Sequence, residues 1–395
     1  MKDLLEYRDE FDSVKDVHYL ISNSLGAMPN KALVTAARYT DLWARRGVRS
    51  WEDEWWKFPR QIGDKVGALI GAAPDSVSIQ ANVSGAHAVI ISCFDITPKR
   101  NKLVMIDMEF PSVGYVYQRA LAEKAEIVTI KSQDGISIPL DELLDAIDER
   151  TLLVPISHIL FRSSYVMDIK AIINKAHSVG ALVMLDAYQA VGAYPLDVSA
   201  LKVDFLAGGT LKWLCGGPGV GFLYVRPDLA ETLEPRLTGW LAHEEPFSFD
   251  NSPMRYASGA YRFQSGTPVI PALYACQAGL DIIAEIGVER IRKRSIEMTT
   301  KLLELADQRG WKTTTPRDSA ERGGTVAIDL PDGLAIAIEL NAQDYLVDYR
   351  PKAGVRISPH FYNTDRELDE VIDKIAEIIA SGAHKKHVSA DRVVS

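Results

Sequence analysis

The sequence has few cysteines and no long apolar run. Only three cysteines occur among 395 residues, Cys93, Cys215 and Cys276, and they are well separated and odd in number. They indicate a reduced compartment and argue against a disulfide framework. No apolar stretch is long enough to cross a bilayer, and residues 1–12 are charged and lack the apolar core of a secretory signal. We therefore expect a cytoplasmic protein that does not enter a membrane.

An excess of positive charge is also missing. The formal net charge is −9, so neither nucleic acid nor an anionic membrane is an expected partner. The histidines are scattered without metal-ligand spacing, which argues against a metal site. There is no Gly-x-Ser-x-Gly elbow. The glycine-rich segment 216–221 also lacks the acidic residue, about 20 positions further on, that a dinucleotide-binding fingerprint requires.

One stretch, residues 181–221, combines apolar runs with isolated polar groups. An apolar run at 181–185 ends on Asp186, and a second run at 203–207 leads through two glycines to Lys212. Both runs are short and bounded by turn residues, so they predict buried parallel strands. Functional groups in open α/β sheets gather at the carboxyl ends of such strands. We therefore expect Asp186 and Lys212 to lie near each other, at neighbouring strand ends.

An acid and a lysine in this arrangement suit the chemistry of pyridoxal phosphate (PLP). The lysine binds the cofactor covalently, and the carboxylate keeps the ring nitrogen protonated so that the ring accepts electrons. The lysine must lose its proton to act, which a desolvated pocket favours. The alternative is that Asp186 caps a helix and Lys212 is a surface residue. However, no other charged residue occurs between Phe205 and Tyr224, and exposed lysines rarely have such apolar neighbours.

The pattern Asp-x-x-Gln, Thr-x-Lys and glycine-rich turn resembles the class V aminotransferase group of PLP enzymes of fold type I. Within that group the chain is most similar to kynureninase, over about residues 17–380. Four further segments carry the match: Asn23–Gly26, Phe110–Ser112, Gly239–Glu244 and Arg356–Pro359.

The resemblance implies PLP as the cofactor and an α/β fold. We expect a large domain with a mostly parallel sheet flanked by helices, and a smaller C-terminal α/β domain. The alternation of strand and helix patterns favours the same architecture. The expected boundaries are an N-terminal arm with helices at 1–70, the large PLP-binding domain at 71–290 and the small domain at 291–395.

The resemblance also assigns residues to the cofactor. Lys212 would hold it and shuttle a proton, and Asp186 would face the ring nitrogen. Small polar residues at 82–87 open a helix whose free N–H groups suit an anion, and in the family this turn holds the phosphate. An ordinary helix cap at Asn82 is the alternative. The other residues expected at the cofactor are Val83, Ser84, Phe110, Ser163, Gln189, Thr210, Trp240 and, from a neighbouring subunit, Thr267.

Arg356 is the residue expected to bind the substrate. A guanidinium holds a carboxylate through two parallel hydrogen bonds, and the apolar strand around Arg356 argues against exposure. In the family the arginine of this strand fixes an amino-acid substrate. The resemblance places Asn23 and Ser24 at the same site. The contribution of Thr267 implies a homodimer with shared active sites.

Three positions depart from the kynureninase pattern, one of them Gln189, which stands in place of a histidine. Leu211 stands where the family has a phenol beside the lysine, and Ser265–Gly266 replaces an asparagine that holds the substrate side chain. The resemblance implies cleavage of a Cβ bond of an α-amino acid, by hydrolysis or elimination, and these departures weaken kynurenine itself as the substrate. Transamination is the main alternative. Cysteine desulfuration is disfavoured because residues 330–355 contain no cysteine, and a non-catalytic scaffold is disfavoured by the acid, lysine and arginine together.

Overall fold

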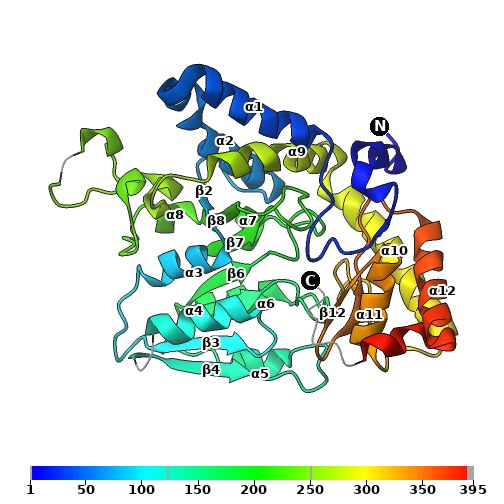
Figure 1. Cartoon of the computed structure of the whole chain (residues 1–395). Helices are drawn as coiled ribbons and strands as arrows, with labels where there is room; N and C mark the ends of the chain where they lie inside the picture. Colours follow the sequence, from blue (N-terminus) through cyan, green and yellow to red (C-terminus); the bar gives the residue numbers. More distant parts are fainter. Residues whose placement is uncertain (1, 122–123, 250, 389–395) are drawn as a thin grey trace.

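The computed structural model describes residues 2–121, 124–249 and 251–388, and its centre is a seven-stranded sheet (Figure 1). The strand order is β2-β8-β7-β6-β5-β3-β4, with β8 antiparallel to both neighbours and the other adjacent pairs parallel. The expected mostly parallel sheet is thus confirmed. Its strands are β2 (Val77–Gln80), β3 (Lys102–Ile106), β4 (Glu126–Ile130), β5 (Thr151–Ser157), β6 (Leu182–Asp186), β7 (Phe205–Gly209) and β8 (Gly221–Val225).

Both faces of this sheet are buried. In β3, Val104 and Ile106 belong to the core on one face, and Leu103 and Met105 belong to the core on the other. This alternation is the period-two geometry of a strand covered by helices on both sides. The helices that connect or follow its strands are α3 (Val83–Ile91), α4 (Pro111–Leu121), α5 (Leu140–Asp145), α6 (Ile169–Ser178), α7 (Val198–Leu201) and α8 (Pro227–Ala230).

Residues 31–70 form two helices separated by turns. α1 (Lys31–Arg46) ends at Gly47, whose φ of 55° lies in the left-handed region that glycine adopts at little cost. A π-helical turn at Trp51–Trp55 follows, and α2 (Phe58–Leu69) has a proline in its first turn. Both helices pack against α9 (Ile270–Ile286), and Figure 1 shows the three together along one side of the sheet.

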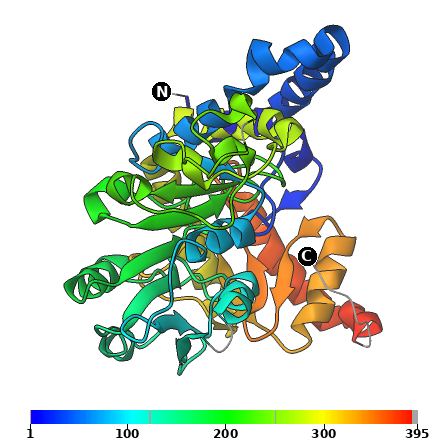
Figure 2. The ribbon, with the colours of Figure 1, turned by 90° about the vertical axis from the view of Figure 1, so that its left-hand side faces the viewer.

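The C-terminal part of the chain builds a second sheet with a core of its own, beside the first (Figure 2). Its order is β12-β13-β10-β9, with every pair antiparallel. The strands are β9 (Lys312–Thr313), β10 (Val326–Asp329), β12 (Asp348–Arg350) and β13 (Gly354–Ile357). The helices packed on it are α10 (Val288–Gln308), α11 (Gly333–Ala342) and α12 (Asp365–Ser381).

The N-terminal segment joins the two sheets. β1 (His18–Tyr19) pairs in parallel with β11 (Tyr345–Leu346), next to the smaller sheet. Further on, the N–H of Gly26 donates to the carbonyl of Leu211 at 2.8 Å. A Cβ at Gly26 would lie 2.1 Å from the carbonyl oxygen of Lys212, so this close approach requires glycine. The segment is therefore held against the loop that carries Lys212.

Short helical turns and loops make the remaining connections. The 3-10 turns lie at Leu5–Glu10, Asp12–Val14, Gly47–Arg49, Trp240–Ala242, Pro246–Ser248, Gly259–Phe263 and Ala383–His387. In the ranges that the structure describes, no helix combines the length and apolar character needed to span a bilayer.

Candidate active site

A cavity of about 280 Å³ lies where the carboxyl ends of the large sheet meet the smaller sheet and the N-terminal segment. Ser157 and Asp186 are the last residues of β5 and β6 and lie opposite each other in the strand register. Lys212 follows β7, the neighbour of β6, by three residues. Arg350 and Arg356 reach the cavity from β12 and β13. The structure thus places Asp186 and Lys212 just at or after the ends of adjacent strands, as expected.

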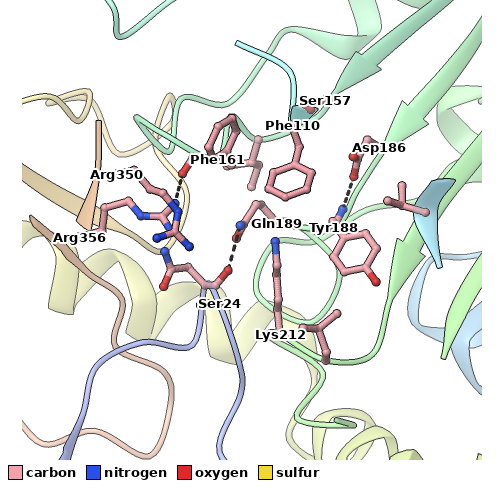
Figure 3. Close-up of a pocket in the computed structure, with 14 residues that line it drawn as sticks. Ser24, Phe110, Ser157, Phe161, Asp186, Tyr188, Gln189, Lys212, Arg350 and Arg356 are labelled. Atoms are coloured by element: carbon pink, nitrogen blue, oxygen red, sulfur yellow. Dashed lines mark hydrogen bonds between the residues drawn. The ribbon is translucent and has the colours of Figure 1, made fainter. Parts of the chain in front are cut away.

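The side chains divide the cavity into two halves (Figure 3). Asp186 and Tyr188 lie on one side, the two arginines lie on the other, and Lys212 points up between them. The Nζ of Lys212 is 5.0 Å from the centre of the Tyr188 ring and 5.7 Å from that of Phe110. Eight residues expected at the cofactor or substrate line the cavity: Asn23, Ser24, Val83, Phe110, Asp186, Gln189, Lys212 and Arg356.

The surroundings of Lys212 favour its neutral amine. Burial lowers the pKa of Lys212 to about 8, and the charge of Arg356 adds to this effect while that of Asp186 opposes it. Among the described residues, no hydrogen bond or ion pair engages the amine. A lysine that loses its proton near neutral pH is suited to attack an aldehyde.

The carboxyl of Asp186 lines the cavity on the side away from the arginines and is only 5% exposed. Its Oδ1 accepts the backbone N–H of Tyr188 at 2.9 Å. Burial raises the pKa of Asp186, while this N–H and the charge of Lys212 act in the opposite direction. A carboxylate with so little solvent gains from a cationic partner, which a protonated ring nitrogen would provide.

Arg356 is 2% exposed and is held in one orientation by protein groups. Its Nε donates to Oδ1 of Asp348 at 2.7 Å, its Nη2 donates to the other oxygen of that carboxylate, and its Nη1 donates to the carbonyl of Phe161. Asp348 is fully buried and opposite Arg356 in the β12–β13 register. These bonds use three of the five guanidinium N–H groups, so two are left for a carboxylate in the cavity.

A second guanidinium, that of Arg350, lies on the same side of the cavity as Arg356. Its Nη2 lies 3.4 Å from Oδ2 of Asp348, so two guanidinium groups share one buried carboxylate. Both arginines line the cavity. Guanidinium groups that line a cavity favour a ligand with a carboxylate.

Asn23 provides a test of whether the cavity suits a polar ligand. It is 1% exposed, yet neither its side-chain nitrogen nor its side-chain oxygen has a partner among the described residues. Its backbone carbonyl accepts Nε2 of Gln189 at 3.0 Å, and Oε1 of Gln189 accepts the indole N–H of Trp213 at 2.9 Å. Buried amides are nearly always paired. The unpaired amide of Asn23 and the amine of Lys212 together fit PLP with an amino-acid substrate.

Four expected cofactor residues outside the cavity are used locally. The side chain of Asn82 caps α3 by accepting the N–H of Gly85 at 3.0 Å, and Ser84 lies in the first turn of that helix. The hydroxyl of Ser163 donates to the carbonyl of Ile136 at 2.7 Å. The hydroxyl of Thr210 donates within the glycine-rich turn, to the carbonyl of Gly217 at 3.1 Å. Their contacts with the cofactor stay predictions.

Two more expected residues lie away from the cavity of the single chain. Trp240 packs against Trp56 and Phe247, with ring centres 5.6 and 5.8 Å away. Thr267 is exposed, as a residue that serves a neighbouring subunit would be. Their roles also stay predictions.

Sequence reasoning did not single out five side chains of the cavity: Ser157, Ile159, Phe161, Tyr188 and Arg350. Tyr188 could have been predicted from the sequence, because it follows Asp186 by two residues. Asp348 and Arg350 have the i, i+2 spacing that places both on one face of a strand. However, β12 has only three residues, which is too short for a periodic pattern to predict it.

The sheet, the lysine and the buried acid at neighbouring strand ends define a PLP-dependent enzyme of fold type I. The chain belongs to the class-V aminotransferase family, whose model matches residues 18–371. It is 34% identical to YcbU, an uncharacterized aminotransferase of Bacillus subtilis, over 94% of this chain and 97% of that protein. It is 30% identical to the kynureninase of Pseudomonas fluorescens, over 95% of this chain and 92% of that enzyme.

Solved structures show the same fold. The cysteine desulfurase of Thermococcus onnurineus aligns with a TM-score of 0.86 at 22% identity, covering 96% of this chain and 99% of that one. The cystine C–S lyase C-DES aligns with a TM-score of 0.84 at 20% identity, covering 93% and 99%. These alignments confirm the expected fold, and the family model confirms the expected family and, with it, the cofactor.

Proposed function

We propose that this PLP-dependent enzyme binds an α-amino acid and cleaves a bond at its Cβ, by hydrolysis or elimination, as in kynureninase. The observation that carries the proposal is the division of the cavity, in which Arg350 and Arg356 face Asp186 across Lys212. A carboxylate bound at the arginines would lie on the far side of the lysine from the acid. The 30% identity to a kynureninase along nearly the whole chain supports this reaction class.

Each residue of the cavity has a distinct proposed task. PLP, when bound, supplies the electron sink that weakens the bonds at Cα. Lys212 holds the cofactor and moves a proton at Cα with its amine, while Asp186 keeps the ring nitrogen protonated. Arg356 binds the substrate carboxylate with the N–H groups that Asp348 and Phe161 do not use. Asn23 and Ser24 add hydrogen bonds to the substrate from the N-terminal segment.

Tyr188 brings an aromatic ring beside the lysine, where the kynureninase pattern has a phenol. Leu211 occupies the family position, but the Tyr188 ring lies 5.0 Å from the amine of Lys212. Burial and the charge of Asp186 raise the pKa of Tyr188, so its hydroxyl keeps its proton at neutral pH. The Tyr188 ring therefore lies beside the lysine, but its hydroxyl points away from the amine in Figure 3 and lies next to Gly209 of β7.

Transamination is the second candidate, favoured by the 34% identity to a protein named as an aminotransferase. It needs the same lysine and carboxylate site, and a keto acid as the second substrate. Desulfuration fits less well, although solved structures of that class share the fold. None of Cys93, Cys215 and Cys276 lines the cavity, and burial raises the pKa of the Cys93 thiol to about 12.

We also propose that the protein is a cytoplasmic homodimer whose subunits complete each other's sites. Its three cysteines are free, as in a reduced compartment. Large apolar side chains are exposed on α1 and on the loops at 226–270, among them Leu33, Val34, Trp43, Phe247 and Phe249. Exposed apolar surface of this kind is typical of subunit interfaces. Sedimentation of the cofactor-loaded protein should give twice the monomer mass, and a monomer would contradict this proposal.

Product analysis distinguishes the two reactions. The loaded enzyme is incubated with kynurenine, 3-hydroxykynurenine and a panel of S-conjugated cysteines, each with and without pyruvate. Release of an aromatic acid or a thiol without pyruvate supports Cβ cleavage. Turnover that requires pyruvate and forms alanine stoichiometrically identifies an aminotransferase. The Lys212→Ala variant is the matched control and should be inactive in both arms.

A further inference from the structure

A second acid, Glu109, is buried behind the cavity and has no task in the proposed function. It lies between β3 and α4, directly before Phe110, and is 7% exposed. In the described residues, no lysine, arginine or histidine forms an ion pair with it. A buried carboxyl without a cationic partner tends to hold its proton.

Both carboxyl oxygens of Glu109 form hydrogen bonds with Ser157, a residue that lines the cavity. Oε1 accepts the backbone N–H of Ser157 at 2.9 Å, and Oε2 is hydrogen-bonded to the hydroxyl of the same serine. Ser157 lines the cavity and lies opposite Asp186 in the register of β5 and β6. In-register residues of parallel strands project to the same face of the sheet, so Ser157 and Asp186 are side-chain neighbours.

The other groups near Glu109 supply no positive charge. Tyr117 of α4 is fully buried, and its hydroxyl lies 2.9 Å from Nδ1 of His87 of α3. Burial lowers the pKa of His87 to about 3, so its ring is neutral. Burial raises the pKa of Glu109 to about 8; the two bonds from Ser157 oppose the shift, and the charge of Asp186 adds to it. The charged group that affects the pKa of Glu109 is therefore the carboxylate of Asp186, which favours the neutral form of Glu109.

We propose that Glu109 is a neutral positioning residue, which donates its proton to the hydroxyl oxygen of Ser157 and so turns the hydroxyl hydrogen of Ser157 toward Asp186. The inference rests on the proposed role of Asp186 at the ring nitrogen. One acid of the pair remains ionised and the other serves as a hydrogen-bond donor, which avoids two like charges in a dry site. The hydroxyl dipole of Ser157 then points its positive end toward the carboxylate of Asp186, with which Ser157 forms no direct hydrogen bond among the described residues.

The ionisation of Glu109 is measured directly by infrared difference spectroscopy of the cofactor-loaded protein against its Glu109→Gln variant. The proposal predicts a protonated-carboxyl C=O band at pH 7, absent from the variant and lost from the wild type above pH 8. Only a carboxylate band at pH 7 would overturn it. The same measurement on cofactor-free protein keeps this result independent of whether Asp186 contacts PLP.

The coupling through Ser157 is tested on the pH midpoint of the visible absorbance of the bound cofactor. Glutamine has the donor and acceptor pattern of a protonated glutamic acid, so Glu109→Gln should leave the midpoint within about 0.3 pH units of wild type. If Glu109 were ionised, its replacement by glutamine would remove a charge and move the midpoint by about one pH unit. Glu109→Ala should shift the midpoint when Ser157 is present and have no effect in a Ser157→Ala background. Equal shifts in both backgrounds would refute action through Ser157.

A matched variant separates this inference from the proposed function. Asp186→Asn should change the absorbance midpoint if Asp186 faces the ring nitrogen. If Asp186→Asn has no effect, the role of Asp186 fails, while the infrared result on Glu109 still decides whether that acid is neutral.

Discussion

Replacing Lys212 by methionine should stabilise the cofactor-free protein at neutral pH. Methionine has a similar length and no charge, so it removes the cost of holding an ammonium in a desolvated site. The pKa of Lys212 falls from 10.5 to about 8 in the folded protein. This difference in pKa lowers the free energy of unfolding, because the unfolded chain holds the proton of Lys212 more tightly than the folded one.

The destabilisation caused by Lys212 depends on pH. Each pKa unit corresponds to about 1.4 kcal/mol, so the free energy of unfolding is lower by about 3 kcal/mol at pH 7, where Lys212 is mainly charged in both the folded and the unfolded state. The loss falls to about 2 kcal/mol at pH 9 and vanishes above pH 10.5, where the amine is neutral in both states. Water in the cavity reduces the cost, so we expect a gain of about 2–3 kcal/mol for the variant at pH 7.

Urea denaturation of the cofactor-free proteins at pH 7 and pH 9 provides the assay. The exposed Lys131, on the loop after β4, gives a matched control, and Lys131→Met should change stability little at either pH. The informative quantity is the difference between the two variants and its decline from pH 7 to pH 9. A Lys212→Met variant that is less stable than wild type, or a gain that does not depend on pH, would refute the reasoning.

Three further predictions concern the site and the segment that closes it. Arg356→Lys should raise KM for the amino acid about 10- to 100-fold with unchanged cofactor absorbance, because a bidentate bond is lost; steady-state kinetics and spectra test this. The rate of PLP capture by cofactor-free protein should rise about tenfold per pH unit below pH 8 and level off above it, since the neutral amine of Lys212 reacts. Gly26→Ala should cost about 1–3 kcal/mol in denaturation and weaken cofactor retention, because its Cβ would meet the carbonyl of Lys212.

The central pair of the site could be predicted because its geometry is local. Asp186 and Lys212 follow two apolar runs, and parallel neighbouring strands bring their carboxyl ends to one edge of the sheet. The burial of Arg356 was predictable for a similar reason, since the strand around it is apolar. The resemblance added Asn23, whose unpaired amide at the cavity is a long-range feature that no local pattern contains.

Other features depend on contacts between distant segments. Glu109 has the sequence context of an ordinary turn acid between a strand and a helix. It is buried because Ser157, 48 positions later, lies against it. Asp348 likewise gains its importance from Arg356 on the next strand. The break in residues 31–70 depends on the positive φ of Gly47, which apolar periodicity does not indicate.

The most direct test of the account is to reduce the PLP-loaded protein with borohydride and map the modified peptide by mass spectrometry. Reduction makes the bond between the cofactor and its lysine permanent. The account predicts a single phosphopyridoxyl group on Lys212, absent from the Lys212→Ala variant. A label on another lysine, or a protein that remains unlabelled after incubation with PLP, would contradict it.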